Sequence, residues 1–326
     1  MRSLVSPGRL ALAVFLIAAA LLPLVLDPRG HLLRVAAMVL LFAAMAQSWN
    51  IVGGLANQIS LGHAAFFGLG AYTSTLLFLK LGVSPWIGMF AGALVAAGAA
   101  ALLSIPTFRL KGHYFALATL AFAEVLRVIA NSWADLTGGP AGLSIPFMGS
   151  QPMLFAFRSV ASYYWIILGL LVVTCAVFYR LSTGALGYKL RAVRENEAAA
   201  EVAGIDTFKV KLTASVISAA LTAMCGTVFA QFTFFFDPDS IFALSGISVR
   251  MAMIAIVGGL GTLGGPIVGA LFLIPLEEVA NAGLSASAAG LSQFAFGVIL
   301  IAAILIQPRG LMAYWPKRAR AALKGA

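Results

Sequence analysis

Residues 180 to 211 read RLSTGALGYKLRAVRENEAAAEVAGIDTFKVK and form the one long polar segment of an otherwise hydrophobic chain. Apolar residues recur in it at spacings near three to four, at Leu190, Val193, Ala198 and Val202. This period and the abundance of Ala and Glu favour a helix, and Gly204 follows where a C-terminal cap belongs. The segment is therefore predicted to be an amphipathic helix that a membrane protein can offer to a soluble partner.

The rest of the chain has the composition of an integral membrane protein. Of its 326 residues, 61% are hydrophobic and 10% are charged, whereas about one quarter of a soluble domain is charged. Runs long enough to cross about 30 Å of hydrocarbon as helices predict an all-α, polytopic protein with about ten spans. They cover residues 10 to 26, 35 to 52, 61 to 79, 84 to 105, 113 to 130, 163 to 179, 212 to 232, 247 to 260, 263 to 280 and 289 to 306.

Lys and Arg residues, which membrane proteins retain on the cytoplasmic side, predict the orientation. Most of the 21 Lys and Arg residues fall on the cytoplasmic side if the N-terminus is cytoplasmic and the chain crosses the membrane an even number of times. Both termini, the loop 180 to 211 and a basic tail at 307 to 326 are then cytoplasmic, and residues 131 to 162 form an external loop of a single transmembrane domain, 1 to 326. The net charge of +10 reflects this topology and contact with anionic lipid. No nucleic-acid partner is expected, because the basic residues do not gather on a soluble domain.

Several kinds of chemistry have no support in the sequence. The phosphate-binding motif G-x-x-x-x-G-K-[ST] is absent, so the chain should not hydrolyse ATP itself. Residues 259 to 264 match G-x-G-x-x-G, but apolar membrane segments flank them, which favours a helix break or tight turn over a nucleotide site. The three histidines are far apart, and none has a second ligand at a suitable spacing, so we expect no metal site. No arrangement of serine, histidine and acid suggests a nucleophile, so we expect no catalytic residues. We expect no cofactor either. Cys175 and Cys225 lie in apolar runs and should be core residues.

Polar residues at the entry of the third span suggest a translocation pathway. Gln58, Ser60 and His63 precede Phe66 in the stretch NQISLGHAAFFGLGAYTSTLL, and polar groups in hydrocarbon usually face a cavity or another helix. Small residues four positions apart in the same stretch have a second explanation, because they let membrane helices approach closely. We assign Gln58, Ser60, His63 and Phe66 to a candidate pathway.

Two segments on the outer side are candidates to receive something from outside. Residues 131 to 162 contain too many Gly and Pro residues for a continuous helix, so we expect a structured loop, with Thr137, Gly138 and Gly139 near the pathway. Residues 234 to 246, FFFDPDSIFALSG, are expected on the same side and carry Asp237 and Asp239. The alternative is that both segments merely connect spans.

Charged residues also occur within the fifth span. Glu124, Arg127 and Asn131 lie at i, i+3 and i+7, on one face of a helix. Because an unpaired charge in the membrane is costly, an internal Glu124–Arg127 pair is expected. Its role is open between a functional site, to which we assign Glu124, and a structural ion pair.

Four stretches resemble a known family. They are NQISLGHAAFFGLGAYTSTLL; KGHYFALATLAFAEVLRVIANSW with LTGGPAGL; LRAVRENEAAAEVAGIDTFKVKLTASVISA; and FFFDPDSI with SVRMAMIAIVGGLGTLGGPIVGA. In this order, over most of residues 57 to 280, they resemble the permease subunit of branched-chain amino-acid ABC importers. The sequence is more similar to the leucine, isoleucine and valine branch than to the urea branch.

The resemblance implies an assembly in the bacterial inner membrane. A second, homologous permease, two cytosolic ATPase subunits and a periplasmic amino-acid-binding protein would complete it. The resemblance also assigns residues 195 to 204 to the element that docks into an ATPase, with its Glu-Ala-Ala at Glu197, Ala198 and Ala199 and with Gly204 one residue later than the general importer pattern places it. Arg191 and Arg194 belong to the same expected coupling site.

The sequence is therefore interpreted as a permease that moves a small apolar zwitterion inward by alternating access. The alternatives are a related permease for urea or another small polar solute, a secondary carrier, which needs no docking helix, and an intramembrane enzyme, which needs a polar catalytic cluster. The apolar spans provide no evident groups to clamp the ammonium and carboxylate of an amino acid, so initial capture is expected from the binding protein.

Overall fold

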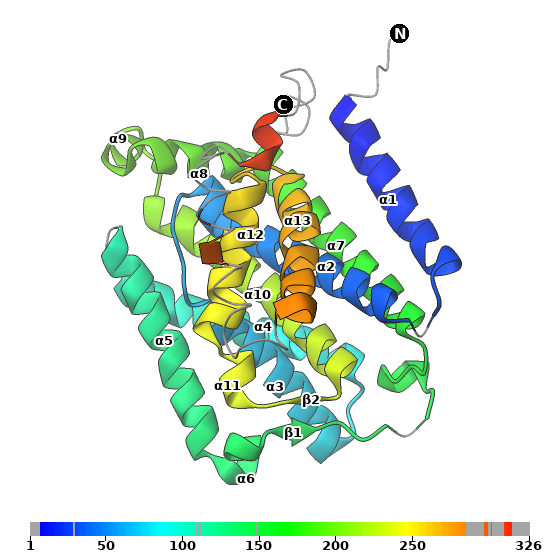
Figure 1. Cartoon of the computed structure of the whole chain (residues 1–326). Helices are drawn as coiled ribbons and strands as arrows, with labels where there is room; N and C mark the ends of the chain where they lie inside the picture. Colours follow the sequence, from blue (N-terminus) through cyan, green and yellow to red (C-terminus); the bar gives the residue numbers. More distant parts are fainter. Residues whose placement is uncertain are drawn as a thin grey trace. The chain divides into compact units, whose positions relative to one another are not determined.

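The computed structural model describes residues 7–28, 30–108, 110, 112–147, 149–284, 297–298, 301 and 310–314. Almost all regular structure in these residues is helical (Figure 1), which confirms the all-α class. The predicted span 289 to 306 and the basic tail 307 to 326 lie almost wholly outside the described residues.

The chain divides into two compact units, with boundaries within α2, α7 and α12. The first contains α1 (Pro7–Val25), α13 (Gly265–Leu284), the 3-10 helix η5 (Leu311–Tyr314) and most of α2 (His31–Asn50), α7 (Val160–Thr183) and α12 (Arg250–Gly258). The second contains the π-helix η1 (Ile51–Leu55), α3 (His63–Leu81), α4 (Pro85–Thr107), α5 (His113–Ser132), α6 (Ala134–Thr137), the 3-10 helix η2 (Gly139–Ala141), β1 (Leu143–Ser144), the 3-10 helix η3 (Pro152–Leu154), α8 (Ala185–Glu195), α9 (Glu197–Val202), α10 (Thr207–Thr233), β2 (Phe235–Phe236), α11 (Pro238–Ile241) and the π-helix η4 (Leu244–Val249).

Among the described residues, seven helical stretches are long and apolar enough to cross a membrane. They are His31–Leu55, His63–Leu81, Pro85–Thr107, His113–Ser132, Val160–Thr183, Thr207–Thr233 and Pro238–Gly258. The last stretch begins well before the predicted run 247 to 260, because α11 is followed two residues later by η4, which leads directly into α12. A total of about ten spans stays a prediction.

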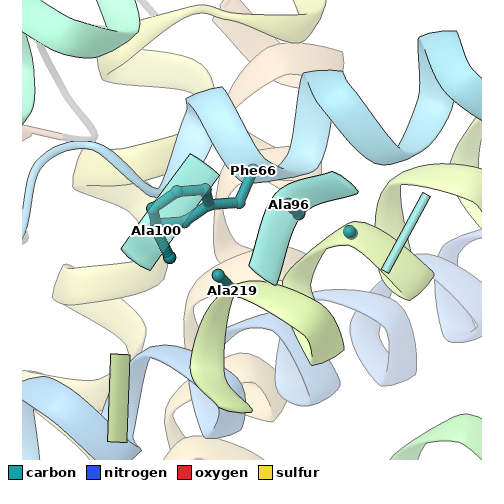
Figure 2. Close-up of a cluster of buried hydrophobic side chains, with 5 residues drawn as sticks. Phe66, Ala96, Ala100 and Ala219 are labelled. Carbon is teal, nitrogen blue, oxygen red and sulfur yellow. The ribbon is translucent and has the colours of Figure 1, made fainter. Parts of the chain in front are cut away.

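The core of the second unit is formed by α3, α4 and α10, which pack on one another. Two glycines allow the closest contacts, because a Cβ atom on Gly70 would lie 2.0 Å from the carbonyl oxygen of Ala223, and one on Gly226 would lie 2.0 Å from that of Phe67. Around this crossing, small side chains leave room for one large ring. Figure 2 shows the ring of Phe66 beside Ala100, with Ala96 and Ala219 from the neighbouring helices. The small residues of the third span therefore do serve helix packing, as one of the two explanations predicted.

The two predicted outer segments meet in a short antiparallel pair. β1 and β2 join Leu143 to Phe236 and Ser144 to Phe235. No continuous helix spans residues 138 to 159; α6, η2 and η3 are each only three or four residues long. Residues 131 to 162 are therefore a structured, mostly non-helical segment, and the pairing of β1 with β2 joins them to residues 235 and 236. Their external position stays a prediction.

The first unit contains the glycine-rich turn between α12 and α13. Gly259 and Gly261 have φ values of 130° and 70°, which favour glycine. A Cβ atom on Gly269 would lie 2.0 Å from the carbonyl oxygen of Ile254, so the two helices cross closely after the turn. The helix break predicted for residues 259 to 264 is confirmed.

Cys175 and Cys225 are buried free thiols, as expected of core residues.

Candidate functional site

The candidate pathway residues lie around a break between two membrane helices. α2 continues into the π-helix η1, and Asn57, with a φ of 54°, ends the helical path. Wider π turns often occur at functional sites. Residues 56 to 62 then cross to α3 without helical structure, and they carry Gln58 and Ser60.

A chain of buried hydrogen bonds fixes this crossing. Trp49 Nε1 donates to the Ser60 carbonyl at 2.7 Å, and the His63 ring contacts the Ser60 hydroxyl through Nδ1 at 2.9 Å and the Ser218 hydroxyl through Nε2 at 2.8 Å. Ser218 Oγ in turn donates to the Ser48 carbonyl at 2.7 Å. Because the Ser218 proton is used in that bond, Nε2–H donates to Ser218. In a neutral imidazole with this tautomer, Nδ1 accepts from the Ser60 hydroxyl, so both ring nitrogens are engaged.

Two further bonds connect the crossing to other helices. Thr119 Oγ1 on α5 accepts from the backbone N–H of Leu61 at 3.0 Å, and Ser248 Oγ on η4 accepts from that of Ala64 at 2.8 Å. The adjoining cavity, lined in part by Ser60, His63 and Phe66, has a volume of about 20 Å³. That is close to the space of one water molecule, so this point is closed to an amino acid in the conformation described.

The polar segment forms two short helices where the sequence predicted one. α8 ends at Glu195, and Asn196 has extended backbone angles while its side chain accepts from the Ala199 N–H at 3.1 Å. Asn196 is thus an N-cap that starts α9 in a new direction. The prediction of one continuous helix was wrong because an N-cap residue interrupts it.

The C-terminal cap was predicted correctly. Gly204 has a φ of 83°, its N–H donates to the Glu201 carbonyl at 2.9 Å, and the Ile205 N–H donates to the Ala200 carbonyl at 3.0 Å. These two bonds form a Schellman motif. Asp206 follows as the N-cap of α10, and its carboxylate accepts from the backbone N–H and the ammonium of Lys209, which hold the pKa of Asp206 below its ordinary value.

The break at Asn196 changes which residues face inward. Leu190 and Val193 of α8 are buried as the stripe predicted, but the buried residue of α9 is Ala200. Ala198 and Ala199 are exposed, and Val202 is 91% exposed. α9 therefore presents a small apolar outer surface, which we call the α9 surface, formed by Ala198, Ala199 and Val202.

Charged side chains attach these helices to the rest of the second unit. Arg194 Nη1 donates to the carbonyl of Gly54 in η1 at 3.0 Å, and Arg191 Nη1 donates to that of Ser182 at 3.0 Å. Lys211 of α10 is only 3% exposed and pairs with Glu197 of α9 at 2.5 Å. Arg191, Arg194 and Glu197, predicted as docking residues, thus make their contacts within this chain.

A cavity of about 330 Å³ lies beside this attachment. It is enclosed by the crossing after η1, the start of α5 and the α8–α9 junction. Gln58 is one of its lining residues, so the structure separates Gln58 from Ser60 and His63. The full lining is Ala56, Asn57, Gln58, Ile59, Leu110, Gly112, His113, Phe115, Ala116, Val193, Arg194 and Glu197.

The charges of the fifth span lie on an exposed face of α5. Arg127 contacts Glu124 with Nε 3.0 Å from Oε2, and it also pairs with Asp239, which accepts from Asn131 Nδ2 at 3.0 Å. The predicted Glu124–Arg127 pair is present. However, the side chains of Glu124 and Asp239 are 50% and 63% exposed. The expectation of an internal pair was wrong for the chain by itself, because α5 buries only a narrow face formed by Phe115, Thr119, Ala123 and Ala130.

Thr137, Gly138 and Gly139 shape the turn after α6. Thr137 Oγ1 donates to the Ala130 carbonyl at 2.6 Å, and the two glycines have φ values of 76° and 54°. They border neither of the two cavities described above. Their assignment to the pathway stays a prediction.

Sequence reasoning missed three residues that the structure brings to these sites: Thr119, Ser218 and Lys211. Ser218 and Thr222 lie one turn apart within an apolar helix, which is a readable sign of a polar contact. Lys211 was counted only as a loop charge. Its ion-pair partner lies 14 positions earlier, beyond the helical spacings that reveal pairs.

The comparisons with known proteins agree with this architecture. Residues 31–304 match the family described as branched-chain amino acid transport system / permease component. The high-affinity branched-chain amino acid transport system permease protein LivM of Escherichia coli (strain K12) is 30% identical over 304 residues, covering 85% of this chain and 69% of that protein. The corresponding LivH of the same strain is 26% identical over 287 residues, covering 83% and 91%. A probable LivM of Methanocaldococcus jannaschii is 23% identical over 288 residues, covering 80% and 81%.

No solved structure matches the chain. The family match nevertheless covers more than half of it, including the crossing at residues 56 to 62, the α8–α9 element and α5. With seven candidate membrane spans in the described residues, the chain is a membrane protein, and it belongs to the branched-chain amino acid transport permease family.

Proposed function

We propose that this permease imports leucine, isoleucine and valine across the bacterial inner membrane, driven by ATP that separate cytosolic subunits hydrolyse. The relatives are named as branched-chain amino acid permeases, and the substrate is carried over from those names. The distribution of Lys and Arg supports a cytosolic position for both termini and for the α8–α9 element. The chain acts as one permease domain, and the hydrolysis of ATP is left to the separate subunits.

The observation that carries this proposal is the α8–α9 element. Its inner face is fixed to the second unit by Arg194 and by the Glu197–Lys211 pair, while the α9 surface has no partner among the described residues. An element fixed on one side and open on the other can transmit the movement of a docked subunit. We therefore place the ATPase on the α9 surface and give Arg194 and Glu197 the role of positioning it.

The exposed face of α5 is the surface that we assign to the second permease. Glu124 and Arg127 of α5, a helix long enough to span a membrane, form with Asp239 of α11 a cluster of net charge −1. Facing lipid, such charges would be costly. A homologous subunit would cover them, and the resemblance of this chain to both LivM and LivH of one strain supports such a pair.

The binding protein is placed at the opposite side, on the segments that β1 and β2 join. Thr137, Gly138 and Gly139 shape this region, and Asp237 caps α11 there. Ser60, His63 and Phe66 would line the pathway in another conformation. The small cavity that they border, about 20 Å³, is consistent with a closed state.

The test is transport by the assembled importer after a charge is placed on the α9 surface. Val202→Arg and Ala199→Arg should each lower ATP-dependent leucine uptake into proteoliposomes at least tenfold and prevent copurification of the ATPase. Met153→Arg is the matched control, since this side chain is apolar and 82% exposed on the other proposed side, and it should leave the ATPase bound. Unchanged uptake and copurification in Val202→Arg would refute the docking assignment, and uptake of urea in preference to leucine would refute the substrate.

A further inference from the structure

The 330 Å³ cavity next to the α8–α9 junction has no role in the proposed coupling, yet its size falls within the range of small-molecule sites, about 300 to 1,000 Å³. Asn57, Ile59 and His113 in its lining are exposed, so the cavity opens to the surface. Its walls carry charges of both signs, which come from the polar loop and not from the membrane spans.

One wall is suited to an anion. Arg194 uses Nη1 for the Gly54 carbonyl, and a guanidinium has five N–H donors in all, so donors remain for a ligand. The first turn of α5 borders the cavity as well, and no side chain caps it at Gly112. The N-terminus of a helix attracts negative charge. Together, these groups form a site for a carboxylate.

Two acceptors also line the cavity, Glu197 at the α8–α9 junction and Gln58 in the crossing. Glu197 gives one carboxylate oxygen to Lys211 at 2.5 Å, and its other oxygen has no partner among the described residues. Gln58 Oε1 is buried and lacks a hydrogen-bond partner. A buried acceptor without a donor is unfavourable, and an ammonium group, with three donors, can satisfy both residues.

Apolar side chains complete the lining. Ile59 comes from the crossing, Phe115 from α5 and Val193 from α8. They offer an aliphatic ligand a surface away from the charged groups. The combination of a carboxylate site, an ammonium site and an apolar wall matches one chemical class, a small α-amino acid with an aliphatic side chain.

We propose that this cavity is an amino-acid site on the side of the coupling helices, which holds the transported amino acid as a zwitterion after it has passed the closed point at His63. The carboxylate binds Arg194 and the start of α5, and the ammonium binds Glu197 and Gln58. The choice of a branched-chain ligand rests on the proposed function. A bound amino acid connects α8 and α9 to the crossing and to α5, so product on this side slows the movement of the coupling helices.

The test is calorimetry on the purified importer without its binding protein. Leucine should bind saturably. 4-Methylpentanoate and 3-methylbutylamine, which keep the leucine skeleton but lack the ammonium and the carboxylate respectively, should bind at least tenfold more weakly, because each loses charge-assisted hydrogen bonds. Gln58→Leu should weaken leucine binding at least fivefold, whereas Gln58→Glu should retain it. Gln231→Leu is the control, since Gln231 of α10 also has a buried unpartnered amide atom but lies outside the cavity.

Absence of saturable leucine binding to an importer that transports leucine would overturn this inference while the proposed function stands. Equal binding by wild type and Gln58→Leu, or an equal loss in Gln231→Leu, would place the site elsewhere and overturn it too. Conversely, binding that depends on Gln58 in an importer that transports a different aliphatic amino acid would support the site and refute only the branched-chain assignment.

Discussion

Two membrane helices of the same unit, α10 and α5, differ in how they are attached. Over an 18-residue apolar window, 61% of α10 is buried and 22% of α5. The backbone of α10 closely approaches that of α3 at Gly226, and α10 also carries the buried Lys211. α5 contacts its neighbours through a narrow face, and its Glu124 is exposed while Arg127 is half-buried between Glu124 and the exposed Asp239 of α11. The comparison indicates that α10 belongs to the packed core of the second unit, whereas the exposed face of α5 is free for the second permease that we propose.

The strongest test of this difference is the buried ion pair at the start of α10. Glu197→Ala leaves the ammonium of Lys211 unpaired at 3% exposure, and removing one partner of a buried pair costs about 3 to 5 kcal/mol. We expect a large drop in the midpoint of thermal unfolding in detergent. The double variant Glu197→Ala with Lys211→Met should recover most of it, and a double variant no more stable than the single one would contradict a buried pair.

The next effect in size concerns the close crossing of α10 and α3. Gly226→Ala places a Cβ atom 2.0 Å from the Phe67 carbonyl oxygen, and overpacking of this kind costs about 1 to 3 kcal/mol. Gly98→Ala on α4 is the matched control, since a Cβ there meets nothing within 4 Å. The same thermal measurement should show destabilisation only for Gly226→Ala. Equal behaviour of the two variants would mean that α10 is not held as closely as described.

Substitutions on α5 should change the stability of the isolated subunit only slightly. Arg127→Gln removes a guanidinium shared by two exposed carboxylates, and exposed pairs contribute about 1 kcal/mol or less. The unfolding midpoint should therefore hardly move, while recovery of the second permease with the tagged chain should fall. Glu124→Gln, which keeps the Arg127–Asp239 pair, should have the weaker effect on assembly. A lone Arg127→Gln subunit as unstable as Glu197→Ala would show that α5 is as firmly integrated as α10.

The smallest expected effect is a pH dependence at the exposed end of α10. Lys209 lowers the pKa of Asp206 in the folded chain, so the carboxylate stabilises the fold at pH values above its unfolded pKa of about 3.9. This contribution is lost as the pH falls through the lower folded value. Asp206→Asn keeps an N-cap but removes the charge. The difference in unfolding midpoint between wild type and Asp206→Asn should be constant from pH 7 to pH 5 and shrink as the pH falls below about 3.9.

The lengths of apolar runs predicted the class of fold and most spans, but not where helices change type. α2 extends past the predicted run because it continues as a π-helix through Leu55. The start of the stretch at Pro238 was assigned to an outer segment, residues 234 to 246, and not to a membrane helix. Its start was nevertheless readable, since Asp237 before a proline is a typical N-cap, and a capping box with Ser240 is present.

The site was predictable only where its signals are local. Gly204 was identified as a cap from its position after a helical pattern, and Asn196 before EAAAE could have been identified as one. The contact of His63 with Ser218 joins residues 155 positions apart, and the Arg194 bond to Gly54 joins residues 140 apart. Such pairs depend on tertiary packing, which no spacing rule in a single sequence contains.

The hydrogen bonds of His63 also bear on how the transport cycle is energised. A carrier driven by a proton gradient needs a group that gains and loses a proton as access alternates between the two sides. In the neutral form, His63 donates through Nε2 to Ser218 and accepts through Nδ1 from Ser60, so uptake of a proton would require the Ser60 hydroxyl to rotate and accept instead. These bonds join the crossing to α10, so opening this point requires that the segments holding Ser60 and Ser218 move apart, which agrees with an energy supply through the coupling helices rather than through protonation.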